Sequence, residues 1–469
     1  MRTISYIKVI FIFFTVLLMA GCESFLEVGA PEHRIVSETV FNNDQTAIGA
    51  MQGIYNQLFR ASYTGGGRET SIHVLAGLAS DELKSIREND QSLTEFYENT
   101  ILPNNTRNLS IWTSAYNIIY MCNSLLEGIE TSEGISENVR IDLEGEAKFI
   151  RAFTYFYLLN LYDDIPLVLS TAYQENALVS RIPVDEVYEQ IITDLTDASN
   201  LLGDAYRNND RTSVNRFVAM AFFARVHLFL GNYSQAASLS TEVIERSSQY
   251  EILDNLDQVF LANSDEAIWQ ISPIGNGGVV TYTNEGTTFI FHPSYPSLTR
   301  VALTEDLVNT FEEEDIRRQN WIGFNENTGY NFAYKYKDRS SFNNITEYSM
   351  VLRLAEQYLI RAEARALSGN LSGAIADINV IRNRAGASLL LSALSSEINQ
   401  NELLNIILEE RRKELFTEWG HRWFDLKRTQ NANIVLNDKT NTWEETDLFF
   451  PIPAEERMKN PNLTQNAGY

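Results

Sequence analysis

The densest run of chemically active side chains lies at residues 409–428, near the end of the chain. Carboxylates and guanidiniums crowd this run, and paired carboxylates could act as general acid and general base. Glu409 and Lys413, however, are spaced i,i+4, and Arg411 and Glu414 are spaced i,i+3. On a helix such opposite charges lie side by side and add about 0.2–0.5 kcal/mol for each pair. We therefore interpret this run as a charged helix with a structural role.

The remaining sequence contains no spacing typical of a common catalytic or metal site. H-E-x-x-H, G-x-S-x-G and phosphate-loop patterns do not occur, and the 5 histidines stand apart. The 2 cysteines are not in a zinc-ligand pattern. We expect no metal, no cofactor and no enzyme activity.

Cys22 has the surroundings of a lipid-attachment site. A basic start is followed by the apolar run 9–20, two small residues end it, and Cys22 comes next. This order is typical of a secretory signal peptide, and the apolar run is shorter than the ~20 residues that a membrane-spanning helix needs. Residues 19–22 are also similar to a bacterial lipobox. We expect cleavage after Gly21 and a lipid on Cys22, which anchors the mature chain to a membrane.

The charge of the chain restricts its partners. Lys and Arg number 37 against 62 Asp and Glu, which gives a net charge of -25. Such an acidic chain repels nucleic acid and anionic lipid headgroups, so we expect no nucleic-acid partner. Cys122 lies in an apolar stretch, so we interpret it as a core residue; with Cys22 lipidated, no intrachain disulfide can form.

Hydrophobic residues recur mostly at helical spacing, so the fold is predicted to be mainly α. Residues 223–236 and 361–374 are similar to each other, each with a Gly-Asn pair between two alanines. Gly-Asn ends one helix and turns the chain into the next, as in tetratricopeptide-like hairpins, which stack because none can bury its apolar face alone.

Residues 263–349 differ in character, because Gly, Asn and Pro interrupt them often. We expect a loop-rich region with short strands, with candidates at 279–280, 287–291 and 333–336. Long irregular segments are where binding usually resides. The predicted organisation is a signal peptide at 1–21, a lipidated segment at 22–45, a helical region with a tetratricopeptide-like repeat at 46–262, the loop-rich region at 263–349, and a helical region with an extended tail at 350–469.

Several stretches together resemble the SusD/RagB family of outer-membrane nutrient-binding lipoproteins of Bacteroidetes, and they occur in one order from Cys22 to Tyr469. They are 22–27, Ser80-Asp81-Glu82, Phe149-Ile150-Arg151-Ala152-Phe153, 161–166, 181–188, 352–364, 409–416, Gly420-His421-Arg422-Trp423-Phe424-Asp425, Pro451-Ile452-Pro453, Asn460-Pro461 and 465–469. The resemblance implies tetratricopeptide-like helical pairs and a loop-rich region that binds a nutrient, often a glycan. It also implies that the protein faces the cell exterior and delivers its ligand to a SusC-like TonB-dependent transporter.

Sugars are bound by flat aromatic faces together with planar polar groups. The candidates are aromatic residues in expected loops and two polar residues near the Ser80-Asp81-Glu82 stretch. The predicted ligand-binding residues are Tyr63, Arg68, Asp81, Tyr97, Tyr282, Tyr295 and Trp321. Two alternatives stay open: a surface glycoside hydrolase, since a carboxylate pair can always be imagined among so many acids, and a tetratricopeptide-like scaffold for protein interaction.

Overall fold

The computed structural model describes residues 40–87, 89–276, 278, 280–342, 344–390 and 398–469. The predicted signal peptide and Cys22 lie outside the described residues. The described chain is mainly helical with a few short strands, as the sequence predicts. The longer helices, of 12 residues or more, are α3 (Asp44–Arg60), α6 (Thr106–Thr131), α7 (Glu137–Tyr162), α9 (Val184–Leu201), α10 (Arg216–Phe229), α11 (Tyr233–Ile244), α15 (Leu354–Leu367), α16 (Leu371–Arg384) and α17 (Gln400–Leu415).

Shorter elements fill the turns and the loop-rich region. The short helices are α4 (Ile72–Ala79), α5 (Gln91–Tyr97), α8 (Tyr173–Asn176), α12 (Asn284–Phe289), α13 (Glu305–Asn309), α14 (Ile316–Trp321), α18 (His421–Arg428), α19 (Ala432–Lys439) and α20 (Ala454–Lys459). The strands are β1 (Leu83–Ser85), β2 (Ile165–Pro166), β3 (Arg181–Ile182), β4 (Ala267–Ile271), β5 (Val301–Leu303), β6 (Ile322–Asn325), β7 (Tyr330–Ala333) and β8 (Ser349–Arg353). They pair antiparallel as β1 with β5, β2 with β3, β4 with β8 and β6 with β7.

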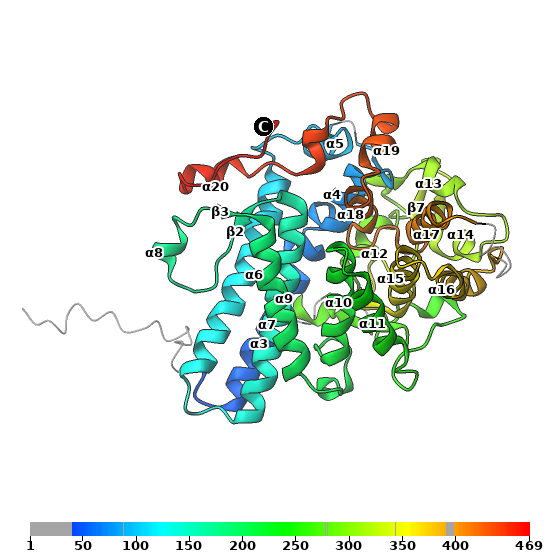
Figure 1. Cartoon of the computed structure of the whole chain (residues 1–469). Helices are drawn as coiled ribbons and strands as arrows, with labels where there is room; N and C mark the ends of the chain where they lie inside the picture. Colours follow the sequence, from blue (N-terminus) through cyan, green and yellow to red (C-terminus); the bar gives the residue numbers. More distant parts are fainter. Residues whose placement is uncertain (1–39, 88, 277, 279, 343, 391–397) are drawn as a thin grey trace, which may run out of the picture.

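The long helices form a row in which each packs on the next. α6 contacts α7, α7 contacts α9, α9 contacts α10, α10 contacts α11, α11 contacts α15, and α15 contacts both α16 and α17. Figure 1 shows this row running from α6 to α16 across the molecule. A row of helical pairs buries the apolar faces that no single pair could bury.

The two similar segments form the two clearest hairpins of this row. Gly231 (φ +73°) follows α10 and Gly369 (φ +83°) follows α15, and this left-handed backbone favours glycine. Ala224 and Ala364 belong to one buried cluster between the hairpins, where their small side chains let the helices approach closely. The predicted helix-turn-helix structure of 223–236 and 361–374 is confirmed.

Phe153 on α7 joins the N-terminal helices to later parts of the chain. Its ring centroid lies 5.1 Å from Phe222 on α10, 5.1 Å from Trp269 on β4 and 5.2 Å from Trp419. Edge-to-face packing of this kind adds about 0.5–1.5 kcal/mol for each pair beyond the area buried. These contacts make one core from segments that are far apart in sequence.

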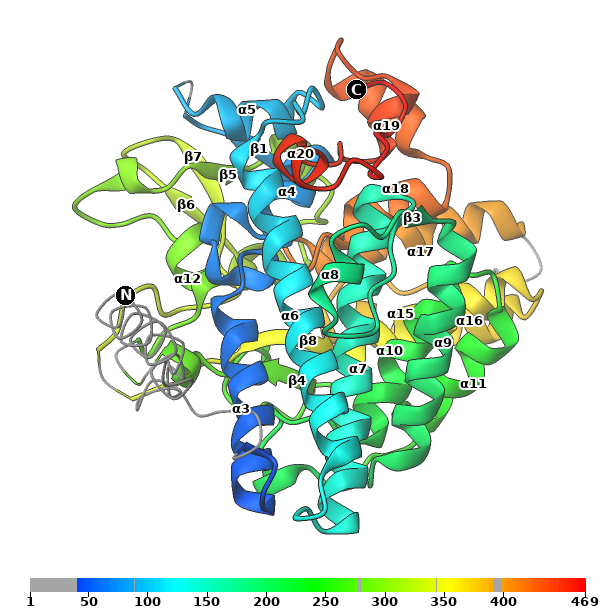
Figure 2. The same cartoon turned by 90° about the vertical axis from the view of Figure 1, so that its left-hand side faces the viewer.

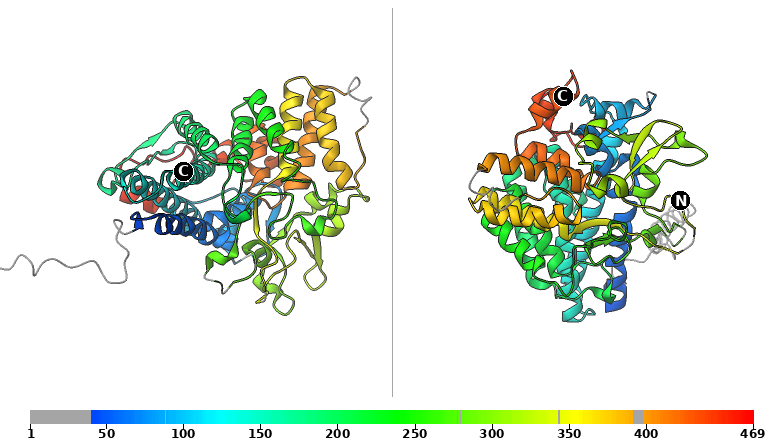
Figure 3. Two further views of the ribbon diagram at one scale, coloured as in Figure 1. Left: turned by 90° about the horizontal axis from the view of Figure 1, so that it is seen from below. Right: turned by 90° about the vertical axis from the view of Figure 1, so that its right-hand side faces the viewer.

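Between α11 and α15 the chain leaves the helical row and returns to it. β4 pairs with β8, and β8 continues directly into α15. Figure 3 (left) shows this yellow-green part of the chain on one side of the helices, and in Figure 2 the β4–β8 pair lies behind α6 and α7. The pairing holds the two ends of the loop-rich region together.

The strand candidates in this region are partly wrong. Residues 287–289 belong to helix α12, because the Thr283 hydroxyl accepts a hydrogen bond from the backbone N–H of Gly286 and caps that helix. Of 333–336, only Ala333 lies in a strand, at the end of β7. Residue 280 lies in no strand, and residue 279 lies outside the described residues.

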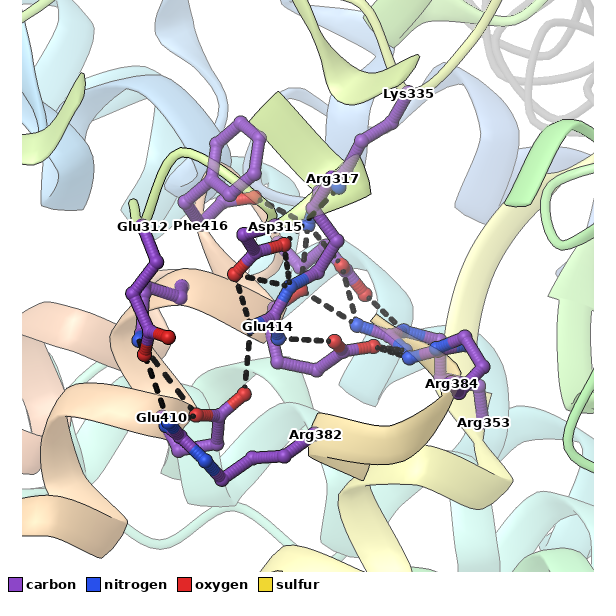
Figure 4. A network of polar contacts seen from close by, with 12 residues as sticks. Glu312, Asp315, Arg317, Lys335, Arg353, Arg382, Arg384, Glu410, Glu414 and Phe416 are labelled. Atoms are coloured by element: carbon purple, nitrogen blue, oxygen red, sulfur yellow. Dashed lines mark hydrogen bonds and ion pairs between the residues drawn. The ribbon is translucent and has the colours of Figure 1, made fainter. Parts of the chain in front are cut away.

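The charged run at 409–428 is structural, but its predicted pairs are wrong. The Glu414 carboxylate is fully buried and binds Arg353, Arg384 and Arg317, which come from three other elements (Figure 4). Arg411 binds Asp425 at 2.7 Å rather than Glu414. Burial alone would raise the pKa of Glu414, but the three guanidiniums hold it well below its ordinary value. The network ties α17 to α14, β8 and α16.

Candidate ligand-binding site

The structure removes Tyr63 and Trp321 from the candidate site. Both side chains are fully buried. The Tyr63 hydroxyl lies 2.9 Å from Thr154 Oγ1, because the glycine-rich segment beside it is a tight turn packed into the core rather than an open loop. Trp321 ends α14, and its Nε1–H donates to the Leu256 carbonyl at 3.3 Å. Neither ring has a free face for a sugar, so the prediction is wrong for these two residues.

Asp81 and Tyr97 line a different pocket, of about 510 Å³, between α5, α18 and α19. Asp81 accepts from Arg422 Nε at 2.7 Å and Arg422 Nη2 at 2.8 Å, and Arg412 Nη2 lies 2.8 Å away. Burial would raise the pKa of Asp81, yet the two guanidiniums lower it overall. The Lys439 ammonium lies 4.8 Å from the centre of the Tyr97 ring. These polar groups already satisfy one another, so this pocket is a weaker candidate.

Another pocket, of about 440 Å³, lies where the loops meet. We call it the loop pocket. Its lining residues are Arg87, Asn89, Asp90, Gln91, Ser92, Arg107, Ser297 and Arg300. They come from the connection between β1 and α5, the first turn of α5, the first turn of α6, and the segment leading into β5. The β1–β5 pairing brings these loops together, and the Ile86 N–H extends it by donating to the Arg300 carbonyl at 2.9 Å.

Asp90 organises the loop pocket. Its Oδ2 accepts from Arg107 Nη2 at 2.9 Å and from Arg300 Nη1 at 2.5 Å, while the Ser92 hydroxyl donates to its Oδ1 at 2.9 Å. Burial would raise the pKa of Asp90, but Ser92 and the two guanidiniums lower it overall, so the carboxylate is charged at neutral pH. Arg107 also donates to Thr70 Oγ1 at 3.1 Å. One carboxylate thus joins three separate segments.

Several polar groups of the loop pocket remain open to a ligand. The Arg300 side chain is 45% exposed, although Asp90 holds one of its nitrogens. Arg87 is half-buried, and it has no ion pair within the described residues. Asn89 and Gln91 are exposed, and their amides make no hydrogen bond to any described residue. Planar amides and guanidiniums are the groups that bind sugar hydroxyls.

Three of the predicted residues, Arg68, Tyr282 and Tyr295, do not line the loop pocket; Arg68 begins a short 3-10 helix, and the two tyrosines lie outside helices and strands. Tyr295 is 63% exposed and stands two residues before Ser297, and its backbone N–H donates to His292 Nδ1 at 3.0 Å. Tyr282 is half-buried and Arg68 is exposed. Both are close enough to Arg339 to affect its pKa, which burial lowers, which the charge of Arg68 lowers further, and which Tyr282 raises.

Sequence reasoning missed the arginines of the loop pocket. Arg87 follows the Ser80-Asp81-Glu82 stretch, Arg107 lies in the first turn of α6, and Arg300 follows Tyr295.

Sequence reasoning also missed a pocket of about 360 Å³ lined by Trp112, Tyr116, Tyr120 and Tyr173. The first three recur every four residues on α6 and therefore look like core residues. Tyr120 is 52% exposed and Tyr173 is 74% exposed, however. We call this the tyrosine pocket; it shares no lining residue with the loop pocket.

Other expectations concern metals and membranes. Within the described ranges, no three His, Cys, Asp or Glu side chains gather where a metal ion could be held. None of the described helices is both long and apolar enough to cross a membrane.

Cys122 is buried and unpaired, and burial raises the pKa of its thiol to about 12, which agrees with the predicted core role.

The row of helical hairpins with a loop-rich region beside it defines a class of tetratricopeptide-like proteins that present a binding site on loops. Comparison with known proteins identifies the family within this class. The model of the SusD family matches residues 324–469. A second family model, described as starch-binding and associating with the outer membrane, matches residues 26–228.

Individual relatives agree with these matches. SusD-like protein P25 of Formosa agariphila is 25% identical over 520 residues, covering 96% of this chain and 97% of the relative. The starch-binding protein SusD of Bacteroides thetaiotaomicron is 22% identical over 436 residues, covering 73% and 75%. A SusD superfamily structure from Bacteroides vulgatus superposes with a TM-score of 0.80 at 19% identity, covering 92% of this chain and 100% of that one. The chain belongs to the SusD/RagB family.

Proposed function

We propose that this protein is a cell-surface lipoprotein that binds a glycan in the loop pocket and delivers it to a SusC-like TonB-dependent transporter of the outer membrane. The loop pocket carries the proposal. It combines free amides and guanidiniums with an exposed tyrosine nearby, on loops held by a rigid helical scaffold. Such a site gives hydrogen bonds to hydroxyl groups and an aromatic face for the C–H side of a sugar ring.

Binding without catalysis agrees best with the groups in this pocket. A glycoside hydrolase needs two carboxyl groups about 5–9.5 Å apart across the scissile bond. Among the described lining residues Asp90 supplies the only carboxylate, and it is bound to Arg107 and Arg300. A carboxylate held in this way has a lowered pKa and is unsuited to act as a general acid.

The expected anchor and the family support the proposal of delivery to a transporter. A lipid on Cys22 would hold the protein at the membrane, because each buried methylene of a lipid chain adds about 0.8 kcal/mol. A relative of the chain is named a starch-binding protein, and a solved relative at 22% identity is named laminarin-binding. These names support a glycan, rather than a peptide, as the ligand of this chain.

Titration calorimetry with a panel of oligosaccharides tests the binding proposal. We expect at least one glycan to bind, and the same glycan to keep its length after overnight incubation with the protein. New reducing ends in that incubation would support the glycoside hydrolase instead. If no glycan binds while a TonB-dependent transporter still co-purifies in mild detergent, the protein is the interaction scaffold.

A further inference from the structure

The loop pocket has the opposite charge to the rest of the protein. The chain as a whole has a net charge of -25. The described lining residues of the pocket include three arginines, Arg87, Arg107 and Arg300, but only one acid, Asp90. At physiological salt, charges more than about 8–10 Å apart are largely screened, so acids elsewhere on the surface have little effect inside the pocket. A ligand in the pocket therefore meets the arginines rather than the average charge of the chain.

Asp90 cannot neutralise the arginines that it binds. Its Oδ2 is shared by Arg107 and Arg300, and its Oδ1 is taken by the Ser92 hydroxyl. Among the described residues, the other acid near Arg300 is Glu69, whose Oε1 lies 4.0 Å from Arg300 Nε. Arg87 has no acidic partner within the same part of the chain. The described acids thus leave at least one positive charge of the pocket without a counterion.

Two further arginines, Arg68 and Arg339, lie near each other outside the loop pocket. Arg68 and Arg339 form no ion pair with any described residue, and the charge of Arg68 is felt at Arg339. Keeping like charges together costs free energy, and this cost is recovered when an anion binds between them. The guanidinium group also has the planar fork of donors that matches the two oxygens of a carboxylate or a sulfate.

From these observations we infer that the loop pocket binds an acidic glycan, one whose sugar units carry carboxylate or sulfate groups, with Arg87 and Arg300 as the residues that contact the acidic group. The inference rests on the proposed function, since it specifies the ligand of the same pocket. Arg107 has a different role. Its guanidinium is held by Asp90, Ser92 and Thr70, so it positions the pocket rather than contacting the ligand.

A neutral glycan is the competing ligand, because guanidinium groups also donate to hydroxyls. The two ligands differ in their response to salt and in the effect of removing charge. Salt screens the attraction between an acidic group and arginine, so it weakens the binding of an acidic ligand. A hydroxyl carries no charge, so its hydrogen bond with arginine responds little to salt. We therefore compare acidic and neutral ligands of equal length, with the sulfated and the neutral galactan as the pair that is matched in its sugar backbone.

The experiment is calorimetry on the whole protein in a neutral detergent, with three probes: oligogalacturonate, a sulfated galactan oligosaccharide and a neutral galactan oligosaccharide. We expect one of the acidic probes to bind at least tenfold more tightly than the neutral probe, and its affinity to fall severalfold between 50 and 500 mM NaCl. The probe that binds tells whether the acidic group is a carboxylate or a sulfate. The salt series needs no variant, so it is independent of any folding defect.

Variants then locate the contact. Arg87→Gln and Arg300→Gln should each lower the affinity for the acidic probe by about tenfold, as expected for a lost hydrogen bond to a charged group. Arg318→Gln is the control, because Arg318 is exposed and lies outside the pocket. It should change the affinity less than twofold.

Three results would overturn the inference in different ways. If the neutral probe binds as tightly as both acidic probes and salt has no effect, the ligand is a neutral glycan, and the proposed function still stands. If no glycan in the wider panel binds, the proposed function itself is wrong. Equal losses in Arg318→Gln and Arg300→Gln would show that surface charge in general, not the loop pocket, attracts the probe.

Discussion

The carboxylate of Asp90 and the guanidinium of Arg300 meet at 2.5 Å, although the two residues are 210 positions apart in the chain. Asp90 belongs to the connection that follows β1, and Arg300 directly precedes β5. The pairing of β1 with β5 brings both residues to the same edge, where Arg107 at the start of α6 completes the contact. The loop pocket is therefore formed by one two-stranded sheet and by one carboxylate that two arginines bind.

Filling the loop pocket should abolish binding without affecting the fold. Ser297 lines the pocket and is exposed, so Ser297→Trp places an indole in the space a ligand would occupy. We expect glycan affinity to fall more than tenfold, with the melting temperature unchanged within about 2 °C, since surface substitutions usually change stability by less than 0.5 kcal/mol. Ser247→Trp, at an exposed position away from the pocket, is the matched control. Unchanged affinity in Ser297→Trp would move the site elsewhere.

The two exposed tyrosines test which pocket binds the glycan. Tyr295→Ala removes the aromatic face beside the loop pocket and should weaken binding by about tenfold, the size expected for one lost stacking contact. Tyr173→Ala removes an equally exposed ring from the tyrosine pocket. Calorimetry should show no change for it. The reverse pattern would place the glycan in the tyrosine pocket.

How far the sequence predicts this molecule depends on the kind of contact. The hairpins at 223–236 and 361–374 follow from local residues, because a glycine after a helix needs no distant partner to end it. The loop pocket depends on strand pairing between β1 and β5, two strands of three residues each, and such short strands give no clear periodic signal. The burial of Trp321 also depends on distant contacts, since its surroundings are set by Leu256 and Lys335 rather than by its neighbours in sequence.

Trp321 should matter for stability alone. Its ring is fully buried and has the Lys335 ammonium 4.9 Å from its centre. Trp321→Ala should lower the free energy of unfolding by about 3–5 kcal/mol through the cavity that it leaves. Urea unfolding followed by circular dichroism measures this loss. At temperatures where the variant stays folded, glycan affinity should equal that of the wild type. A folded variant that binds more weakly would return Trp321 to the binding site.

Glu82 should make stability fall as the pH rises. Burial and the neighbouring Asp81 charge raise the pKa of Glu82 to about 8 in the folded protein, against an ordinary value of 4.5. Between these two values the folded state holds a proton that the unfolded chain has released. This contribution to stability is complete below about pH 4.5 and is lost as the pH rises through 8. The Glu82→Gln variant, which carries no titrating group, should lose less stability between pH 5 and pH 8 than the wild type.

Urea unfolding at pH 5, 6, 7 and 8 measures the difference between the two proteins. Glu409→Gln is the control, because the Glu409 side chain is 48% exposed and should leave the pH profile unchanged. Parallel profiles for wild type and Glu82→Gln would mean that Glu82 is charged in the folded protein.

The two cysteines separate anchoring from packing. Cys22 is the expected lipid site, so Cys22→Ser should leave the protein without its anchor, and fractionation of cells should find it outside the membrane pellet. Cys122→Ser changes a buried thiol whose pKa burial raises to about 12, which leaves it without the thiolate that acylation needs. This variant should stay in the membrane fraction, with stability lowered by about 1–3 kcal/mol because a hydroxyl is buried in its place. Retention of Cys22→Ser in the pellet would mean that a protein partner, rather than a lipid, holds the chain at the membrane.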